Sequence, residues 1–572
     1  MKIEGEPRLL LESAALGVVG AVTAQLFMWM LRLCDRIFLY RIAGYRPPGI
    51  ESPHGLVQQI GPHGLLLIPI VTTLGGLISG FLVYKFAPEA EGHGTDTAVS
   101  AFHRQEGIIR PRVAPLKMVA SAITIGSGGS AGREGPIALI AATLGSWYAR
   151  LAKRPENERR LLLLAGMAAG LSAIFRSPMG TGVFAIEVLY GEMDFEAGAL
   201  LYTMCSSTVA YAVNGLFVGY APLFEIPPIA TPTFRDNVSY AILGLASGVV
   251  GTILPVVFYG ARDLFHALPV PTWTKPAIGG LGVGLLALWL PQVLQGGYGW
   301  IQLAADGRLA LGLLLPLVFA KTVAFALTVS SGGSGGVFAP SLFVGAMLGG
   351  SFAILLHQPS AVFVVVGMAA VFGAAARVPI ATMLMVTEMA GGFHLLVPAG
   401  LAVMIGYLLQ RSLSVNLKYK SMYEGQVLKQ KDSPAHYQER IQTALSLLGR
   451  RNLHLTDNLG HLDLLRMMRS HVRFDLPGKK ELAMATVFDG SPLTGKTIGW
   501  LYNELRESEF EIVAVMRREH VLLPHPGSLL EPHDRLILIA SVAAYEPLQK
   551  FVTWVKDDGE SAAQMPAGGT QV

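Results

Sequence analysis

Two glycine-rich segments of the chain combine a flexible backbone with a helix start, a combination able to bind an anion. The first is GGSAGREGP at residues 128–136, and the second is GGSGGVFAP at residues 332–340, 204 positions later in the chain. Glycines let backbone N–H groups converge, and a helix beginning near Pro136 presents unpaired N–H groups and the positive end of its dipole. The pair predicts an anion site built from amides and dipoles that releases its ligand readily.

A carboxylate, Glu134, stands in the first segment where such an anion would lie, and Phe338 is its counterpart in the second. When ionised, Glu134 could occupy the site itself, and when protonated or displaced it would leave the path open. We therefore interpret it as a gate. Two simpler interpretations compete: the glycines could serve only close helix packing, and Glu134 could merely cap its helix.

The composition indicates that these segments lie in a membrane. Of the 572 residues, 52% are hydrophobic and 15% are charged, which is typical of a polytopic membrane protein. Residues 9–34 and 64–84 form two membrane-length segments. Residues 237–261 and 276–305 carry no Asp, Glu, Lys or Arg, and each is long enough to cross the hydrocarbon as a helix. The net charge of +4 gives no indication of nucleic-acid binding.

A second pair of matching segments shows that the membrane part is duplicated. Residues 161–191 align with residues 364–392, and the matches include Glu187 with Glu388. Duplicated apolar segments interrupted by glycine predict a transporter-like bundle with its ligand near the midplane of the membrane. A channel at the axis of an oligomer is the alternative. We interpret Glu187 and Glu388 as structural carboxylates that bind backbone groups.

The cytoplasmic side is indicated by basic residues. The loop at 150–160 and the stretch at 412–432 are rich in Lys and Arg, and the start of the chain has no cleavage signature. We therefore expect both termini in the cytoplasm. After residue 425 we expect a linker (426–480), a small cytoplasmic α/β domain (481–555) and a disordered tail (556–572).

Three motifs resemble those of the CLC family of chloride channels and proton-coupled chloride transporters. They are GREGP (132–136), GVFAP (336–340) and KSMYEG (420–425), and the resemblance covers roughly residues 10–425. It implies an α-helical polytopic membrane protein, with a duplicated, inverted-repeat bundle of broken and tilted helices over residues 1–425. It also implies a homodimer with one pore per subunit, in the inner (plasma) membrane of a prokaryote.

The resemblance also implies particular site residues. Glu134 would be the gate, and the anion would be bound by His93, Gly94, Arg133, Glu134, Gly135, Val337, Phe338 and Tyr423. Tyr419 is the fallback for the pore tyrosine, and a tyrosine in this position could alternatively anchor the protein at the membrane interface.

Two positions depart from the family pattern. In GHGTD (92–96) His93 replaces the serine that contacts the central anion, which puts anion selectivity in doubt. Val188 replaces the inner glutamate that relays protons in exchangers, and valine cannot carry a proton. Val188 therefore favours a passive channel gated by Glu134, with a proton-coupled antiporter that uses another inner route as the alternative.

The C-terminal domain contains GSPLTGKT (490–497), which formally matches a phosphate-binding loop. The domain is too short for the parallel sheet that such a loop serves, so we predict no nucleotide hydrolysis and no enzyme. It resembles instead the C-terminal subdomain of RCK (TrkA-type) potassium-conductance regulators. This implies a dimerising module that binds a small regulator such as a cyclic dinucleotide, or a purely structural clamp. A ligand sensor with this domain as its main output is a further alternative. No metal or other cofactor is expected, apart from chloride as the transported substrate.

Overall fold

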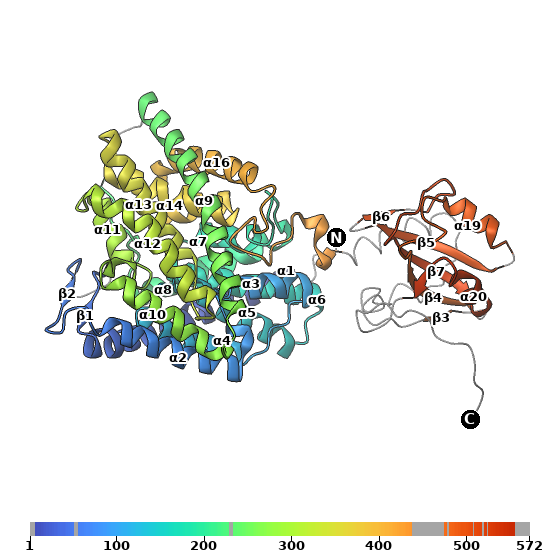
Figure 1. Cartoon of the computed structure of the whole chain (residues 1–572), viewed down its shortest axis with the longest axis horizontal. Helices are drawn as coiled ribbons and strands as arrows, with labels where there is room; N and C mark the ends of the chain where they lie inside the picture. The colour runs from blue at the N-terminus through green and yellow to red at the C-terminus, as the bar shows by residue number, and fades with distance from the viewer. Residues whose placement is uncertain are drawn as a thin grey trace. The chain divides into compact units, whose positions relative to one another are not determined.

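The computed structural model describes residues 6–50, 55–227, 233–436, 474–476, 480–506, 508–517, 520–522 and 524–554. The chain divides after Gln430 into two compact units (Figure 1). Most of the predicted linker and all of the predicted disordered tail lie outside the described residues.

The first unit is a bundle of α-helices. Its first half contains α1 (Glu6–Asp35), α2 (Ile68–Phe86), α3 (Thr95–Arg104), α4 (Val113–Gly126), α5 (Glu134–Leu151), α6 (Glu156–Phe175), α7 (Pro178–Glu187) and α8 (Leu200–Val218). The second half contains α9 (Phe234–Ala267), α10 (Lys275–Ala287), α11 (Tyr298–Ala305), α12 (Leu311–Ser330), α13 (Phe338–Leu356), α14 (Ser360–Ala376), α15 (Pro379–Met389) and α16 (Leu396–Leu413). α1 continues as a π-helix (Arg36–Ile42), followed by a short antiparallel pair, β1 (Tyr45–Arg46) and β2 (Gln59–Ile60).

Several helices have the length and apolar character needed to cross a membrane. Among the described residues these are Pro7–Ile42, Ile68–Phe86, Phe234–Ala267, Leu311–Ser330, Phe338–Leu356 and Phe393–Leu413. The segments predicted at 9–34, 64–84 and 237–261 are thereby confirmed as helices.

The prediction of one crossing helix over residues 276–305 is wrong. α10 ends at Ala287 and α11 begins at Tyr298, and the residues between them include Pro291 and the pair Gly296 and Gly297. Proline cannot donate the helical hydrogen bond, and glycine is a poor helix former. The chain is therefore broken here, as it is at the two segments recognised in the sequence.

Helices α2 and α10 show that the two halves are related by an internal two-fold axis. They pack against each other through glycines 204 positions apart: a Cβ atom on Gly76 would lie 2.2 Å from the carbonyl oxygen of Pro276. Reciprocally, a Cβ atom on Gly280 would lie 2.3 Å from the carbonyl oxygen of Thr72. Equivalent residues thus exchange roles across the contact, as an inverted repeat requires.

The second unit is built on an antiparallel sheet. Its strands are β3 (Phe474–Leu476), β4 (Lys480–Thr486), β5 (Phe510–Arg517), β6 (His520–Leu522), β7 (Arg535–Ser541) and β8 (Thr553–Trp554), in the order β3-β4-β7-β5-β6 with β8 on β4. Helices α19 (Ile498–Glu504) and α20 (Tyr545–Leu548) contribute apolar residues to its core.

The segment GSPLTGKT forms turns that lead into α19, where the side chain of Thr497 accepts a hydrogen bond from the N–H of Trp500 (3.2 Å). All described strand pairs of this sheet are antiparallel. A phosphate-binding loop serves a parallel sheet, so this antiparallel sheet differs from the kind that holds such a loop. The absence of nucleotide hydrolysis stays a prediction.

Candidate functional site

The two glycine-rich breaks of the membrane unit lie against each other. The N–H of Gly132 donates to the carbonyl oxygen of Gly336, and the N–H of Gly336 donates to the carbonyl oxygen of Gly132, both at 2.7 Å. These residues are equivalent in the two repeats, 204 positions apart. An antiparallel exchange between equivalent residues places the internal two-fold axis at this point.

Glycine is required here because three chain segments meet backbone to backbone. A Cβ atom on Gly336 would lie 2.7 Å from the backbone nitrogen of Gly135, and one on Gly135 would lie 2.1 Å from the carbonyl oxygen of His93. Gly94 has φ +87°, a conformation that favours glycine. The three predicted motifs GHGTD, GREGP and GVFAP are therefore in direct contact.

Three helices begin at this meeting point. α3 begins at Thr95, directly after Gly94, α5 begins at Glu134, and α13 begins at Phe338, directly after Val337. The first N–H groups of a helix have no partner inside it, and the positive end of the helix dipole lies there. The geometry can therefore hold an anion without a buried metal or a covalent bond, as the sequence predicts.

The carboxylate of Glu134 lies buried at this junction, with 1% of the residue exposed. Tyr298, the first residue of α11, donates its hydroxyl hydrogen bond to Oε1 of Glu134, and Nε of Arg133 lies 4.0 Å from the same oxygen. A Cβ atom on Gly132 would overlap Oε2 of Glu134. The carboxylate is thus held across the break by residues of both repeats.

Tyr298 is a contact of Glu134 that the sequence analysis missed. It follows the break at residues 288–297, which looks like part of an uninterrupted apolar stretch. The signal that could have found it is the repeat itself, because the offset of 204 aligns GGYG at 296–299 with GHGT at 92–95. The tyrosine thus stands in the repeat position of the first filter motif.

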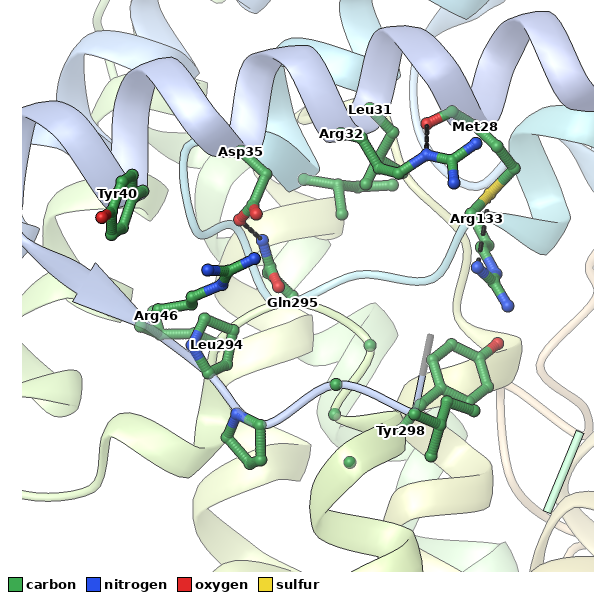
Figure 2. A pocket seen from close by; sticks show the side chains of 18 of the residues that line it. Met28, Leu31, Arg32, Asp35, Tyr40, Arg46, Arg133, Leu294, Gln295 and Tyr298 are labelled. Atoms are coloured by element: carbon green, nitrogen blue, oxygen red, sulfur yellow. Dashed lines mark hydrogen bonds between the residues drawn. The ribbon is translucent and has the colours of Figure 1, made fainter. Parts of the chain in front are cut away.

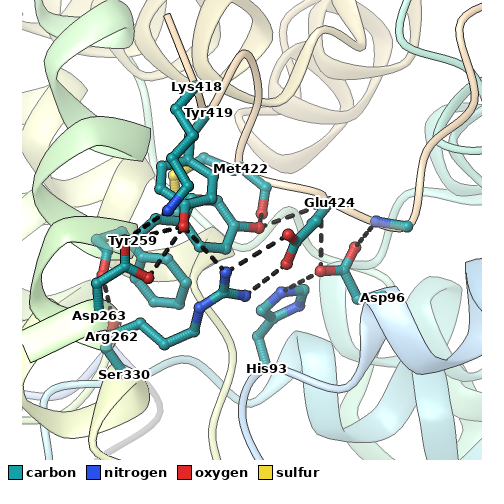
Figure 3. Close-up of polar contacts among 12 residues, drawn as sticks. His93, Asp96, Tyr259, Arg262, Asp263, Ser330, Lys418, Tyr419, Met422 and Glu424 are labelled. Atoms are coloured by element: carbon teal, nitrogen blue, oxygen red, sulfur yellow. Dashed lines mark hydrogen bonds and ion pairs between the residues drawn. The ribbon is translucent and has the colours of Figure 1, made fainter. Parts of the chain in front are cut away.

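His93 is buried on another side of the junction, with its side chain 7% exposed. Its Nε2 lies 3.1 Å from Oδ2 of Asp96, as Figure 3 shows, and its ring centroid lies 5.5 Å from that of Tyr423. Its Nδ1 has no hydrogen-bond partner among the described residues. Contact of this ring with an anion remains a prediction.

Tyr423 is the tyrosine that reaches the junction. It is 3% exposed, and its ring centroid lies 6.5 Å from that of Phe184, which in turn packs against Phe338 at 6.1 Å. This burial does not fit an anchor at the membrane interface. Tyr419, the fallback, instead stacks on Tyr259 at 4.5 Å and takes no part in the junction (Figure 3).

Phe338 takes the place in the second repeat that Glu134 has in the first. Its ring packs against Phe175 at 4.4 Å and Phe372 at 4.1 Å. An aromatic ring enclosed in this way has no charge to move, so the second break keeps one arrangement whereas the first carries a titratable group.

Two buried lysines fix the loops that precede α3 and α11. Nζ of Lys117 donates to the carbonyl oxygens of Ala90 (2.9 Å) and Gly92 (2.6 Å). Nζ of Lys321, 204 positions later, donates to those of Val293 (2.8 Å) and Gln295 (2.5 Å). Buried cations are tolerated only with such partners. These lysines position the filter loops, a role that the sequence analysis did not assign.

The two repeat-related glutamates cap each other's helices. Glu187 at the end of α7 accepts hydrogen bonds from the N–H groups of Ile380 (3.1 Å) and Ala381 (2.6 Å) at the start of α15. Glu388 near the end of α15 accepts from Ser177 and from the N–H of Gly180 (2.9 Å) at the start of α7. The prediction that both bind backbone groups is confirmed. Val188, next to Glu187, is fully buried.

A cavity of about 630 Å³ lies beside Arg133 and Tyr298, the two side chains next to the Glu134 carboxylate (Figure 2). Arg133 and Tyr298 line it together with residues of the loop at 294–299 and the end of α1. Its charged residues are Arg32, Arg36, Arg46, Arg133 and Asp35. An excess of arginines raises the local concentration of anions, and the cavity is thus a suitable mouth for an anion path.

The described residues contain no group of three His, Cys, Asp or Glu side chains that could hold a metal ion. The fold and the junction define a class of protein: a polytopic membrane protein of two inverted halves in which the N-terminal ends of broken helices meet.

The chain belongs to the voltage gated chloride channel family, whose model matches residues 75–411. It is similar to the H(+)/Cl(-) exchange transporter ClcA of Salmonella agona (strain SL483), with 32% identity over 392 residues. That match covers 66% of this chain and 83% of the relative. The protein of the same name from Salmonella arizonae is 31% identical over the same length.

Solved structures share the fold. A slow cyanobacterial Cl-/H+ antiporter has a TM-score of 0.64 at 21% identity, and covers 73% of this chain and 96% of its own. A CLC-type fluoride/proton antiporter has a TM-score of 0.63 at 24% identity, with 75% and 99% covered. The family match ends before the second unit, so its resemblance to TrkA-type regulators stays a prediction.

Proposed function

We propose that this chloride-transporting family member conducts chloride passively, through a pore in which Glu134 is the gate. The observation that carries the proposal is the position of the Glu134 carboxylate, at the start of α5 and against the break that contains Gly132. An ionised carboxylate there competes with an anion for the same helix ends. Protonation or displacement of Glu134 frees the site.

Passive conduction is favoured by the side chains near the end of α7. The family's inner proton carrier would stand at Val188, which cannot accept a proton. The neighbouring Glu187 already accepts hydrogen bonds from Ile380 and Ala381 with its two oxygens, Oε1 and Oε2. A carboxylate committed to a helix start is poorly placed to shuttle protons.

Proton-coupled exchange is the second candidate, and one observation favours it. His93 and Asp96 form a titratable pair 3.1 Å apart at the junction, on the side of Tyr423. The Salmonella relatives are named as H(+)/Cl(-) exchange transporters, and exchange by this chain would need an inner proton route of this kind.

The test is chloride flux in liposomes that contain the purified protein, with internal pH recorded at the same time. Passive conduction predicts chloride movement down its gradient without uphill proton movement. Proton uptake driven by the chloride gradient would overturn the passive mechanism and support exchange. Absence of any chloride flux would contradict both.

For the remainder of the chain we propose a homodimer in a prokaryotic plasma membrane with both termini in the cytoplasm, and a regulatory role for the second unit. Its antiparallel sheet and apolar core support an independently folded module. A thermal-shift screen with cyclic dinucleotides, nucleotides and anions tests the regulatory role. Stabilisation by one compound supports it, and the absence of any shift favours a structural clamp.

A further inference from the structure

We propose that His93, paired with Asp96, carries protons from the Tyr423 side of the pore to Glu134, in place of the carboxylate that is absent at Val188. The proposal rests on the assignment of Glu134 as the gate and adds the route by which the gate is protonated. It applies to a passive channel, where it sets the response to pH on one side, and to an exchanger, where it would complete the proton path.

Asp96 is the exposed end of this pair. Its side chain is 25% exposed, so the pair is open to water on this side. Its oxygens accept hydrogen bonds from the N–H groups of Gly425 (2.9 Å) and Glu424 (3.2 Å), which fix the carboxylate at the start of α3. Among the described residues its ion-pair partner is His93. An imidazolium at His93 would therefore be paired as soon as it formed.

His93 is the buried end. Its Nε2 faces Asp96, and its Nδ1 is buried without a hydrogen-bond partner among the described residues. Buried polar nitrogens are normally satisfied, so an unpaired one indicates a missing transient partner such as a water molecule, an anion or a proton acceptor. A ring with one nitrogen on an exposed carboxylate and the other unpaired has the arrangement that a proton relay needs.

The remaining charged groups around the pair are already engaged. Arg262 at the end of α9 binds Glu424 (2.5 Å), and Asp263 next to it binds Lys418 (2.9 Å), as Figure 3 shows. On the other side Lys117 is bound to backbone carbonyl groups. Glu91 accepts a hydrogen bond from Tyr84 (2.7 Å).

The uncharged tyrosines that face the pair are also hydrogen-bonded. Tyr423 contacts the side chain of Thr95, and Tyr259 donates to the carbonyl oxygen of Met422 (3.0 Å). Of the groups named here, these bonds and ion pairs leave His93 and Glu134 for a relay at the junction, with Asp96 as the counter-ion of His93.

The backbone brings His93 next to the gate. The carbonyl oxygen of His93 lies against Gly135, the residue that follows Glu134. The last step passes from Nδ1 of His93 to the carboxylate of Glu134 through a water molecule, which would also give Nδ1 the hydrogen-bond partner that it lacks among the described residues. The second repeat has no such pair, because the offset of 204 places Gly297 opposite His93 and Trp300 opposite Asp96.

In its neutral resting form, His93 carries its ring proton on Nε2, which donates to the Asp96 carboxylate. Nδ1 takes a proton from water on the Tyr423 side and forms the imidazolium, which the Asp96 anion stabilises. Nδ1 then releases that proton through a water molecule to Glu134, whose carboxylate becomes a neutral carboxylic acid. The ring returns to its resting tautomer, and one proton has moved from solution to the gate.

The experiment measures chloride efflux from liposomes that contain the full-length protein, at fixed pH on one side and varied pH on the other. Lowering the pH on the Tyr423 side from about 7.5 to about 5.5 should raise the wild-type rate at least threefold. His93→Gln keeps the size and polarity of the side chain, and Asp96→Asn keeps its shape. Each should reduce this response below about 1.5-fold while leaving the response to pH on the other side.

Matched controls are His63→Gln and Asp306→Asn, which make the same chemical changes at exposed positions away from the junction and should behave as wild type. His93→Ser is a second variant in case His93→Gln folds poorly, as judged by its elution as a single species on size-exclusion chromatography. A full pH response in folded His93→Gln or His93→Ser would overturn the relay. Absence of chloride flux through the wild-type protein would instead contradict the proposed function. Failure of the relay and failure of the proposed function are therefore distinguishable.

Discussion

The two halves of the membrane unit have the same scaffold and different filters. Lys117 and Lys321 hold equivalent loops, and Gly132 and Gly336 pair across the two-fold axis. The filter positions differ, because the first half has the carboxylate of Glu134 where the second half has the enclosed aromatic ring of Phe338. Residues that repeat therefore build the junction, and under the proposed function the residue that breaks the repeat, Glu134, controls it.

The shared scaffold can be tested at the two buried lysines. Lys117→Met or Lys321→Met leaves backbone carbonyl groups without a donor, which should cost about 3 kcal/mol in the free energy of unfolding. Because the two sites are equivalent, the losses should be similar. Thermal unfolding in detergent measures both, and Lys85→Met, at an exposed position in α2, is the control. A large effect in only one half would show that the scaffold is not shared.

The difference between the two filter positions can be tested at Glu134. An ionised carboxylate blocks the site, so wild-type flux should rise as the pH falls and Glu134 becomes neutral. Glu134→Gln, which is always neutral, should give a flux about tenfold higher than wild type at neutral pH and independent of pH. Chloride efflux across a pH series measures this. A pH response that persists in the variant would contradict the gate assignment.

The contact between the halves can be weakened at Tyr298. Tyr298→Phe removes the hydroxyl that donates to Glu134 and keeps the ring under Arg133. Loss of one hydrogen bond to a charged group is worth about 1.5 kcal/mol, which should raise flux at neutral pH about tenfold at most. The double variant with Glu134→Gln should match Glu134→Gln alone. An added effect in the double variant would place Tyr298 outside the gate.

The smallest effect is expected at the mouth. Arg32→Gln with Arg36→Gln removes two charges from the cavity lining and should lower flux about twofold at low ionic strength, with no change at high salt. Arg41 lies in the same π-helix as Arg36 but does not line the cavity. Arg41→Gln should therefore leave the flux unchanged. Equal losses in both variants would indicate a general surface potential.

Much of this organisation could be predicted from sequence because it depends on residue types at fixed spacing. Repeated glycines, a proline in the first helical turn and long uncharged stretches predict the duplication, the two breaks and their helix starts. The break before Tyr298 escaped prediction, because Pro291 and two glycines stand within an apolar stretch that composition alone does not divide. In the second unit, β5 extends over the apolar stretch FEIVAVMR at residues 510–517.

The sequence by itself determined that the chain is a duplicated membrane bundle with one titratable break, because helix starts, apolarity and charge are local properties of the residues. Only the tertiary structure decided what those breaks contact. Glu134 meets Tyr298 across 164 positions of the chain, and Gly132 meets Gly336 through hydrogen bonds that no local pattern specifies. Such contacts depend on how closely packed helices bring distant glycines together, and that packing is a property of the whole bundle.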